Sequence, residues 1–152
     1  MVEKENGLKC RVQLEIKVYR DGRLVDAIAK ERDLVVNGGL DLCIDSLGKS
    51  GADRPDPISH IAIGTDGTAP TASDTALGNE VMREAATYTK TGTGQAKFEA
   101  TFNITGSYTL QEAGLFNAAS GGTMFCRDTF PARTVQDGDT VQVVYTVSFS
   151  AG

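Results

Sequence analysis

The chain of 152 residues has no tryptophan, one histidine and only three cysteines, and these shortages exclude several kinds of chemistry. A structural zinc site needs about four Cys or His ligands in spaced pairs. Cys10, Cys43 and Cys126 lie far apart in the sequence and form no such pair. We therefore expect no metal and no cofactor, and we interpret the cysteines as buried thiols of a protein made in a reducing cytoplasm.

Catalytic motifs are missing as well. The sequence contains no phosphate-binding glycine loop, no Gly-x-Ser-x-Gly elbow and no paired histidines on a helix. The single histidine, His60, lies between Ile58 and Ile61, and we interpret it as a partly buried strand residue rather than a general base. Carboxylates are numerous, but no pattern selects the pair that a glycosidase requires. The sequence therefore predicts a protein that is not an enzyme.

Charge and hydrophobicity exclude two further classes of partner. The formal net charge is -5, which argues against binding to nucleic acid because affinity for phosphates depends on basic clusters. No stretch approaches the roughly 20 consecutive apolar residues of a membrane helix. The first residues also lack the apolar centre of a signal peptide. We therefore expect the protein to bind no nucleic acid and to have no association with a membrane.

What the sequence does contain is a series of alternating apolar and polar residues. Residues 10–18, 98–104 and 141–149 each place apolar side chains at every second position, which is the pattern of a half-buried strand. Turn signals such as Asp21-Gly22 and Asp137-Gly138 separate the strands. Short strands spaced by turns predict an all-β fold, either an antiparallel β-sandwich or a jelly roll.

One short helix is predicted within this all-β chain. Residues 40–47 have helical spacing of apolar side chains, and Gly48 follows at the usual stop position. We expect the helix to pack over one end of the sheet through a stripe formed by Leu40, Cys43, Ile44 and Leu47.

The first 36 residues allow two interpretations. The strand over 10–18, the Asp21-Gly22 turn and a returning strand over 24–36 form a hairpin, whose returning half is charged at 30–33. This hairpin is either one edge of the main sheet or an arm that binds a partner by strand addition. The domain prediction is a hairpin segment over 1–36 and a sandwich body over 37–152, within a single structural domain. On the arm interpretation, the residues that contact the partner are Leu14, Ile16, Val18, Leu24, Ile28 and Arg32.

An internal ion pair is also predicted. Glu112 is followed by the mostly apolar residues 113–116, and a buried carboxylate requires a partner because an unpaired charge costs several kcal/mol there. Arg83, which has the same strand parity as Val81, is the nearest candidate. The hypothesis is that Arg83 and Glu112 join adjacent strands, and the alternative is that both face solvent independently.

Several blocks of the chain resemble a known group of proteins. Residues 61–65 read Ile-Ala-Ile-Gly-Thr, residues 74–77 read Asp-Thr-Ala-Leu, and residues 112–116 read Glu-Ala-Gly-Leu-Phe, ahead of a Thr/Val-rich last strand. Similar blocks in the same order occur in bacteriophage virion structural proteins, and the resemblance spans residues 37–150. That group includes capsid decoration (cement) proteins and components of tails and fibres.

The resemblance implies a binding role in a virion. A short acidic chain without a fibre repeat or coiled coil is most similar to a decoration protein, which binds the outer surface of the head shell as a homotrimer and has the major capsid protein as its partner. Two alternatives stay open: a tail, baseplate or fibre-base adaptor that binds tail proteins, and a receptor- or glycan-binding module. The resemblance supplies no functional residues. Its conspicuous positions are interpreted as turn and packing residues: Gly64, Pro70, Asp74, Leu77 and Gly114.

Overall fold

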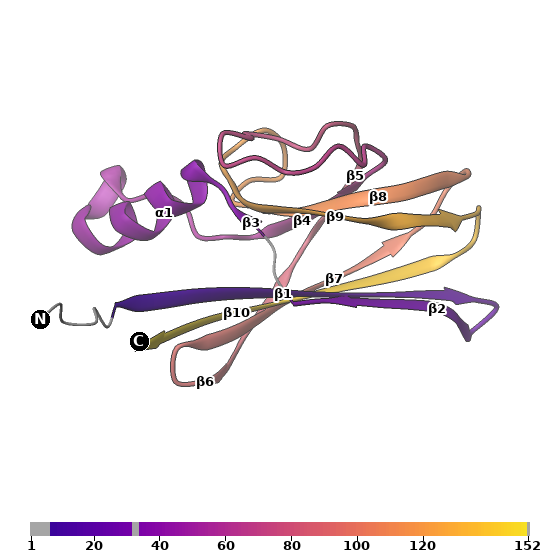
Figure 1. Cartoon of the computed structure of the whole chain (residues 1–152), viewed down its shortest axis with the longest axis horizontal. Helices are drawn as coiled ribbons and strands as arrows, with labels where there is room; N and C mark the ends of the chain where they lie inside the picture. Colours follow the sequence, from indigo (N-terminus) through magenta and orange to yellow (C-terminus); the bar gives the residue numbers. More distant parts are fainter. Residues whose placement is uncertain (1–6, 32–33, 152) are drawn as a thin grey trace, which may run out of the picture.

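The computed structural model describes residues 7–31 and 34–151 and contains two five-stranded β-sheets packed against each other (Figure 1). In chain order the elements are β1 (Leu8–Arg20), β2 (Arg23–Lys30), β3 (Leu34–Val35), α1 (Asn37–Gly48), the short 3-10 helix η1 (Gly51–Asp53), β4 (His60–Gly64), β5 (Glu80–Ala85), β6 (Thr87–Gly92), β7 (Gln95–Asn103), β8 (Tyr108–Phe116), β9 (Met124–Val135) and β10 (Thr140–Ala151). The predicted all-β sandwich with one short α-helix is confirmed.

Each sheet combines strands from both ends of the chain. The first sheet has the order β2-β1-β10-β7-β6, and the second has the order β3-β9-β8-β4-β5. Neighbouring strands are antiparallel in both sheets. The chain passes from the second sheet to the first twice, at Ala86 between the edge strands β5 and β6 and again between β9 and β10.

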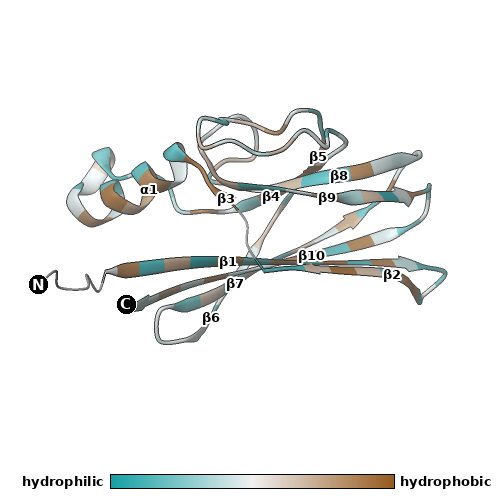
Figure 2. Ribbon diagram, in the orientation of Figure 1, coloured by the Kyte–Doolittle hydropathy of each residue, from teal (hydrophilic) through white to brown (hydrophobic). Residues whose placement is uncertain are grey.

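The core lies between the two sheets and follows from the alternation in the sequence. In β1, β7 and β10 apolar residues at every second position are buried in this core, and the residues between them are mostly polar. Figure 2 shows this alternation of hydropathy along the strands. Each large apolar side chain buried in this way contributes about 1.5–3 kcal/mol to folding. The largest fully buried side chains of this core are Tyr145, Phe102, Ile16, Ile61, Ile63, Leu110 and Leu115. A second, smaller apolar cluster consists of Val36, Ala62, Leu77, Phe116 and Met124.

The N-terminal hairpin belongs to the main sheet. Asp21 and Gly22 form its turn with positive φ angles of 52° and 76°, as the Asp-Gly signal predicts. Strand β1 pairs with β10 from Leu8 opposite Ala151 to Tyr19 opposite Thr140 and has β2 on its other side. The arm interpretation is therefore wrong, and β2 is an edge strand of the first sheet.

The partner-contacting residues assigned to that arm are corrected accordingly. Leu14, Ile16 and Val18 are buried in the core between the sheets and cannot contact a partner. Ile28 is half-buried and packs against the same core. Leu24 is exposed near the hairpin turn, and Arg32 lies outside the described residues.

Helix α1 lies at one end of the sandwich, as expected, but presents a different face to it. The helix begins at Asn37 and ends at Gly48. Gly39 lies so close to the backbone of Phe125 on β9 that a Cβ atom at this position would overlap it. This close approach selects the buried face, which contains Gly39 and Leu42. The predicted stripe is wrong in three of its four residues, because Leu40, Ile44 and Leu47 are exposed.

Candidate functional site

A buried polar network lies on the outer face of the second sheet, beneath the loop of residues 65–79, which we name the covering loop. Ala113 and Leu115 of β8 point into the core, so Glu112 points to the opposite face. Glu112 lies opposite Gly64 of β4. A Cβ atom at Gly64 would overlap the Glu112 carboxylate, so glycine leaves the space that this carboxylate occupies. The Glu112 side chain is completely excluded from solvent.

Four donors surround the Glu112 carboxylate. Its Oε1 accepts a hydrogen bond from the backbone N–H of Gly78 at 2.8 Å and another from Nε of Arg127 at 3.0 Å. Its Oε2 accepts from the backbone N–H of Asp66 at 2.9 Å and from that of Asn79 at 2.8 Å. Both ends of the covering loop are therefore attached to one side chain of the sheet beneath it.

Arg127 of β9 extends the network to the middle of the covering loop. Its Nη1 donates to the carboxylate of Asp74 at 3.1 Å and to the carbonyl oxygen of Thr68 at 3.0 Å, and its Nη2 donates to the carbonyl oxygen of Asp66 at 3.2 Å. Desolvation by itself raises the pKa of Asp74, but hydrogen bonds from Thr71 and the nearby Arg127 outweigh it and hold this pKa below the ordinary value.

This network is suited to structural support. A general acid or base needs a lone pair or proton within reach of substrate, and a metal ligand needs free oxygen lone pairs. The Glu112 carboxylate is saturated by the four donors and shielded from solvent by the covering loop. It holds the covering loop on the sheet.

The predicted Arg83–Glu112 pair is wrong. Arg83 is on β5 and Glu112 is on β8, and β4 lies between these two strands, so the two residues are not on adjacent strands. Arg83 binds Glu80 instead, with 2.6 Å between Nη2 and Oε1. Its guanidinium also lies 3.8 Å from the ring centroid of Phe116.

Strand order indicates which strand carries the true partner of Glu112, but not which residue. β8 and β9 are consecutive strands joined by the loop of residues 117–123, and consecutive antiparallel strands commonly pair. Regular counting outward from that loop would bring Arg127 opposite Ala113, and a register shift beside Leu115 places it opposite Gly114, two residues from Glu112. The contribution of the covering loop has no comparable signal, because its backbone N–H groups carry no sequence information.

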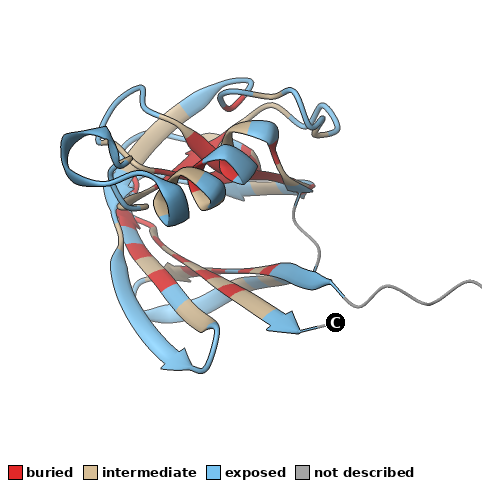
Figure 3. Ribbon diagram, turned by 90° about the vertical axis from the view of Figure 1, so that its left-hand side faces the viewer, coloured by how far each residue is buried: buried red, intermediate tan, exposed pale blue. Residues whose placement is uncertain are grey.

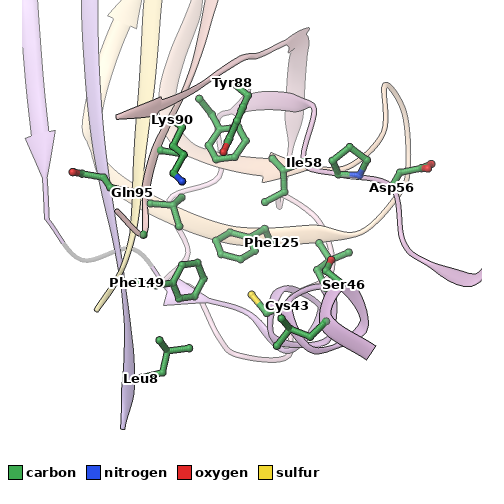
Figure 4. Close-up of a pocket in the computed structure, with 17 residues that line it drawn as sticks. Leu8, Cys43, Ser46, Asp56, Ile58, Tyr88, Lys90, Gln95, Phe125 and Phe149 are labelled. Carbon is green, nitrogen blue, oxygen red and sulfur yellow. The ribbon is translucent and has the colours of Figure 1, made fainter. Parts of the chain in front are cut away.

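A second candidate site is an apolar cavity of about 770 Å³ where the sandwich opens beside α1, which we name the end cavity (Figure 4). Its walls come from α1, the first sheet, Phe125 of β9 and the segment 56–58. Apolar side chains form most of the lining, among them Leu42, Phe98, Val147 and Phe149. Ligand-binding pockets are commonly about 300–1,000 Å³ and mostly apolar, so size and lining suit a binding site.

One cation lines the end cavity. Tyr88 and Lys90 of β6 lie opposite Phe98 and Ala96 of β7, so all four share the inner face of the first sheet. Figure 4 shows the Lys90 side chain directed toward the cavity. Within the described part of the chain Lys90 forms no ion pair.

The ion pair between Arg20 and Asp139 is expected to make the stability of the protein depend on pH. Arg20 donates two hydrogen bonds of 2.9 Å to the buried carboxylate of Asp139, and these lower the pKa of Asp139 from its ordinary value of 3.8. A lowered pKa contributes stability that is present above the ordinary value and is lost as the pH falls through the folded-state pKa. We expect Asp139→Asn to destabilise the protein at about pH 7 and to match wild type more closely near pH 2.

Urea unfolding at a series of pH values measures this difference. Arg20→Gln removes the same interaction and is expected to reproduce the weakened acid dependence. A constant gap between wild type and Asp139→Asn over the whole acid range would contradict the assignment.

Among the described residues, no helix has the length and apolar character needed to cross a membrane. No family model matches the chain, and no curated protein matches it at a significant level.

Proposed function

We propose that this chain is a structural protein of a bacteriophage virion, acting as a capsid decoration (cement) protein. In this role it binds the outer surface of the head shell and stabilises it. The major capsid protein is its partner, and a homotrimer is its assembled form. Binding, without catalysis, is its biochemical activity.

The observation that carries the proposal is the convergence of the three blocks that resemble phage virion proteins. The first block supplies Gly64, the second supplies Asp74, and the third supplies Glu112. Gly64 leaves space for the Glu112 carboxylate, and Asp74 shares Arg127 with it. The resembling residues therefore form one support for the covering loop, which is the kind of shared feature expected of a common structural scaffold.

The fixed covering loop and the end cavity give further support to a binding role. The Glu112 network keeps a surface loop in one conformation, which lowers the entropy cost of binding. The end cavity is an open apolar hollow of a size suited to association. A protein that clamps a shell needs stable surfaces of this type, and many weak contacts across the shell then add through multivalency.

The copy number of the chain in purified virions tests the proposal. Quantitative mass spectrometry of intact particles is expected to find the chain in a fixed ratio to the major capsid protein. Removing the chain genetically is expected to leave heads that lose their DNA at lower temperature, as measured by dye release.

Other outcomes would favour the alternatives. A few copies per particle, recovered with tails after heads and tails are separated, would contradict the decoration role and support a tail, baseplate or fibre-base adaptor. Specific binding to host glycans by particles or by isolated protein, together with low copy number, would support a receptor-binding module.

A further inference from the structure

The end of the sandwich that carries α1 exposes a concentration of apolar side chains. Figure 3 shows this end facing the viewer, with the exposed side of α1 turned toward the viewer. In the described part of the chain, eight large hydrophobic residues are exposed, and five of them belong to this end of the molecule. These five are Leu8 (74% exposed), Leu40 (56%), Ile44 (61%), Leu47 (82%) and Tyr88 (58%).

A projecting apolar surface and an apolar hollow thus lie next to each other. Leu40, Ile44 and Leu47 form one stripe along α1 because they follow the i, i+4, i+7 spacing of a helix face. Leu47 lies at the mouth of the end cavity, so the stripe begins where the cavity opens. Exposed apolar patches next to a cavity mark interaction sites on soluble proteins.

Charge indicates which partner fits. Lys90 lines the cavity, and Asp41 lies on α1 beside the exposed stripe. Neither forms an ion pair with another described residue. The helix therefore carries an available carboxylate next to apolar residues, and the cavity carries an available ammonium group among apolar residues. The two surfaces of one chain are complementary in polarity and in charge.

We propose that the occupant of the end cavity is a second copy of this chain. The exposed stripe of α1 from one copy packs on the open end of the next, and Asp41 of the first copy approaches Lys90 of the second. The two surfaces in this contact are different, and such head-to-tail contacts close into rings when the rotation permits. The inference extends the trimer in the proposed function by assigning its contact surface.

Oligomerisation of the isolated chain tests the inference. Sedimentation velocity and light scattering over a wide range of micromolar concentrations are expected to show concentration-dependent association of wild type. Ile44→Glu is expected to weaken association by at least about tenfold, which corresponds to about 1.4 kcal/mol. The matched control is Leu24→Glu on β2, which changes an exposed apolar residue outside this end and is expected to leave association unchanged.

Charge reversal tests the arrangement of the two copies. Asp41→Lys and Lys90→Glu are each expected to weaken association, and the double variant is expected to restore it. Failure of the double variant to recover, or loss of association in Leu24→Glu but not in Ile44→Glu, would overturn the inference. Circular dichroism and thermal melting confirm that each variant is folded.

A wild type that stays monomeric at every concentration would also overturn the inference and would leave the end cavity to a foreign chain or a small apolar ligand. This result is distinguishable from failure of the proposed function. Copy number is measured on particles and does not depend on the association of isolated protein.

Discussion

Replacing Arg127 by methionine is expected to lower the free energy of unfolding by about 3–5 kcal/mol, because it leaves the carboxylate of Glu112 buried without its counter-charge. A domain of this size is stable by only about 5–15 kcal/mol, so the variant loses a large part of its stability. The middle of the covering loop also loses its attachment to the sheet, since Arg127 bonds Thr68 and Asp74 there. Urea unfolding measures the energy, and hydrogen exchange of residues 65–79 measures the release of the loop.

Two further variants distinguish the effect of this buried network on stability from that of an exposed ion pair. Lys49→Met breaks the exposed pair with Asp45 and is expected to cost less than about 0.5 kcal/mol. Combining Arg127→Met with Glu112→Gln is expected to cost less than the sum of the single changes, with a coupling of about 0.5–3 kcal/mol. An Arg127→Met variant as stable as the Lys49→Met control would show that the network does not hold the loop.

Deleting residues 1–36 is expected to abolish cooperative folding. The deletion removes β1 and the edge strand β2 from the first sheet and exposes the long edge of β10, which pairs with β1 along its whole length. It also removes four core side chains of β1, each of which contributes about 1.5–3 kcal/mol by burial. Together, the burial energies of these four side chains are comparable with the free energy of unfolding of a whole domain. Circular dichroism and one-dimensional proton NMR are expected to show an unfolded or aggregated chain.

Point variants provide the control for the deletion. Ile16→Ala leaves a cavity in the core and is expected to cost about 2–5 kcal/mol, whereas Leu24→Ala, on the exposed edge strand, is expected to cost less than about 1 kcal/mol. A truncated chain that unfolds in one sharp transition would contradict the placement of β1 within the main sheet.

The sequence was sufficient for the elements that depend on local pattern. The alternation in β1, β7 and β10 predicted strands because side chains of a strand point to opposite faces with a period of two. The Asp21-Gly22 turn was predictable because both of its residues require positive φ. The number of layers followed as well, since a sheet with one apolar face needs a second layer to cover it.

Tertiary structure decided what each element contacts. Periodicity placed Leu40, Ile44 and Leu47 on one face of α1, but the close approach of Gly39 to Phe125 turned that face to solvent. The returning half of the hairpin is charged because β2 is an exposed edge strand, whereas β10, from the other end of the chain, pairs with β1 on its other side.

In the candidate site, too, the sequence predicted one part and tertiary structure decided the other. The sequence by itself determined that Glu112 needs a partner, because a buried carboxylate must be compensated. Tertiary structure determined that the partner is Arg127 and not Arg83, because β9 pairs directly with β8 whereas β4 separates β5 from β8. Strand order and register are set by contacts between residues distant in the chain, and local alternation is identical in every register that keeps the same face inward.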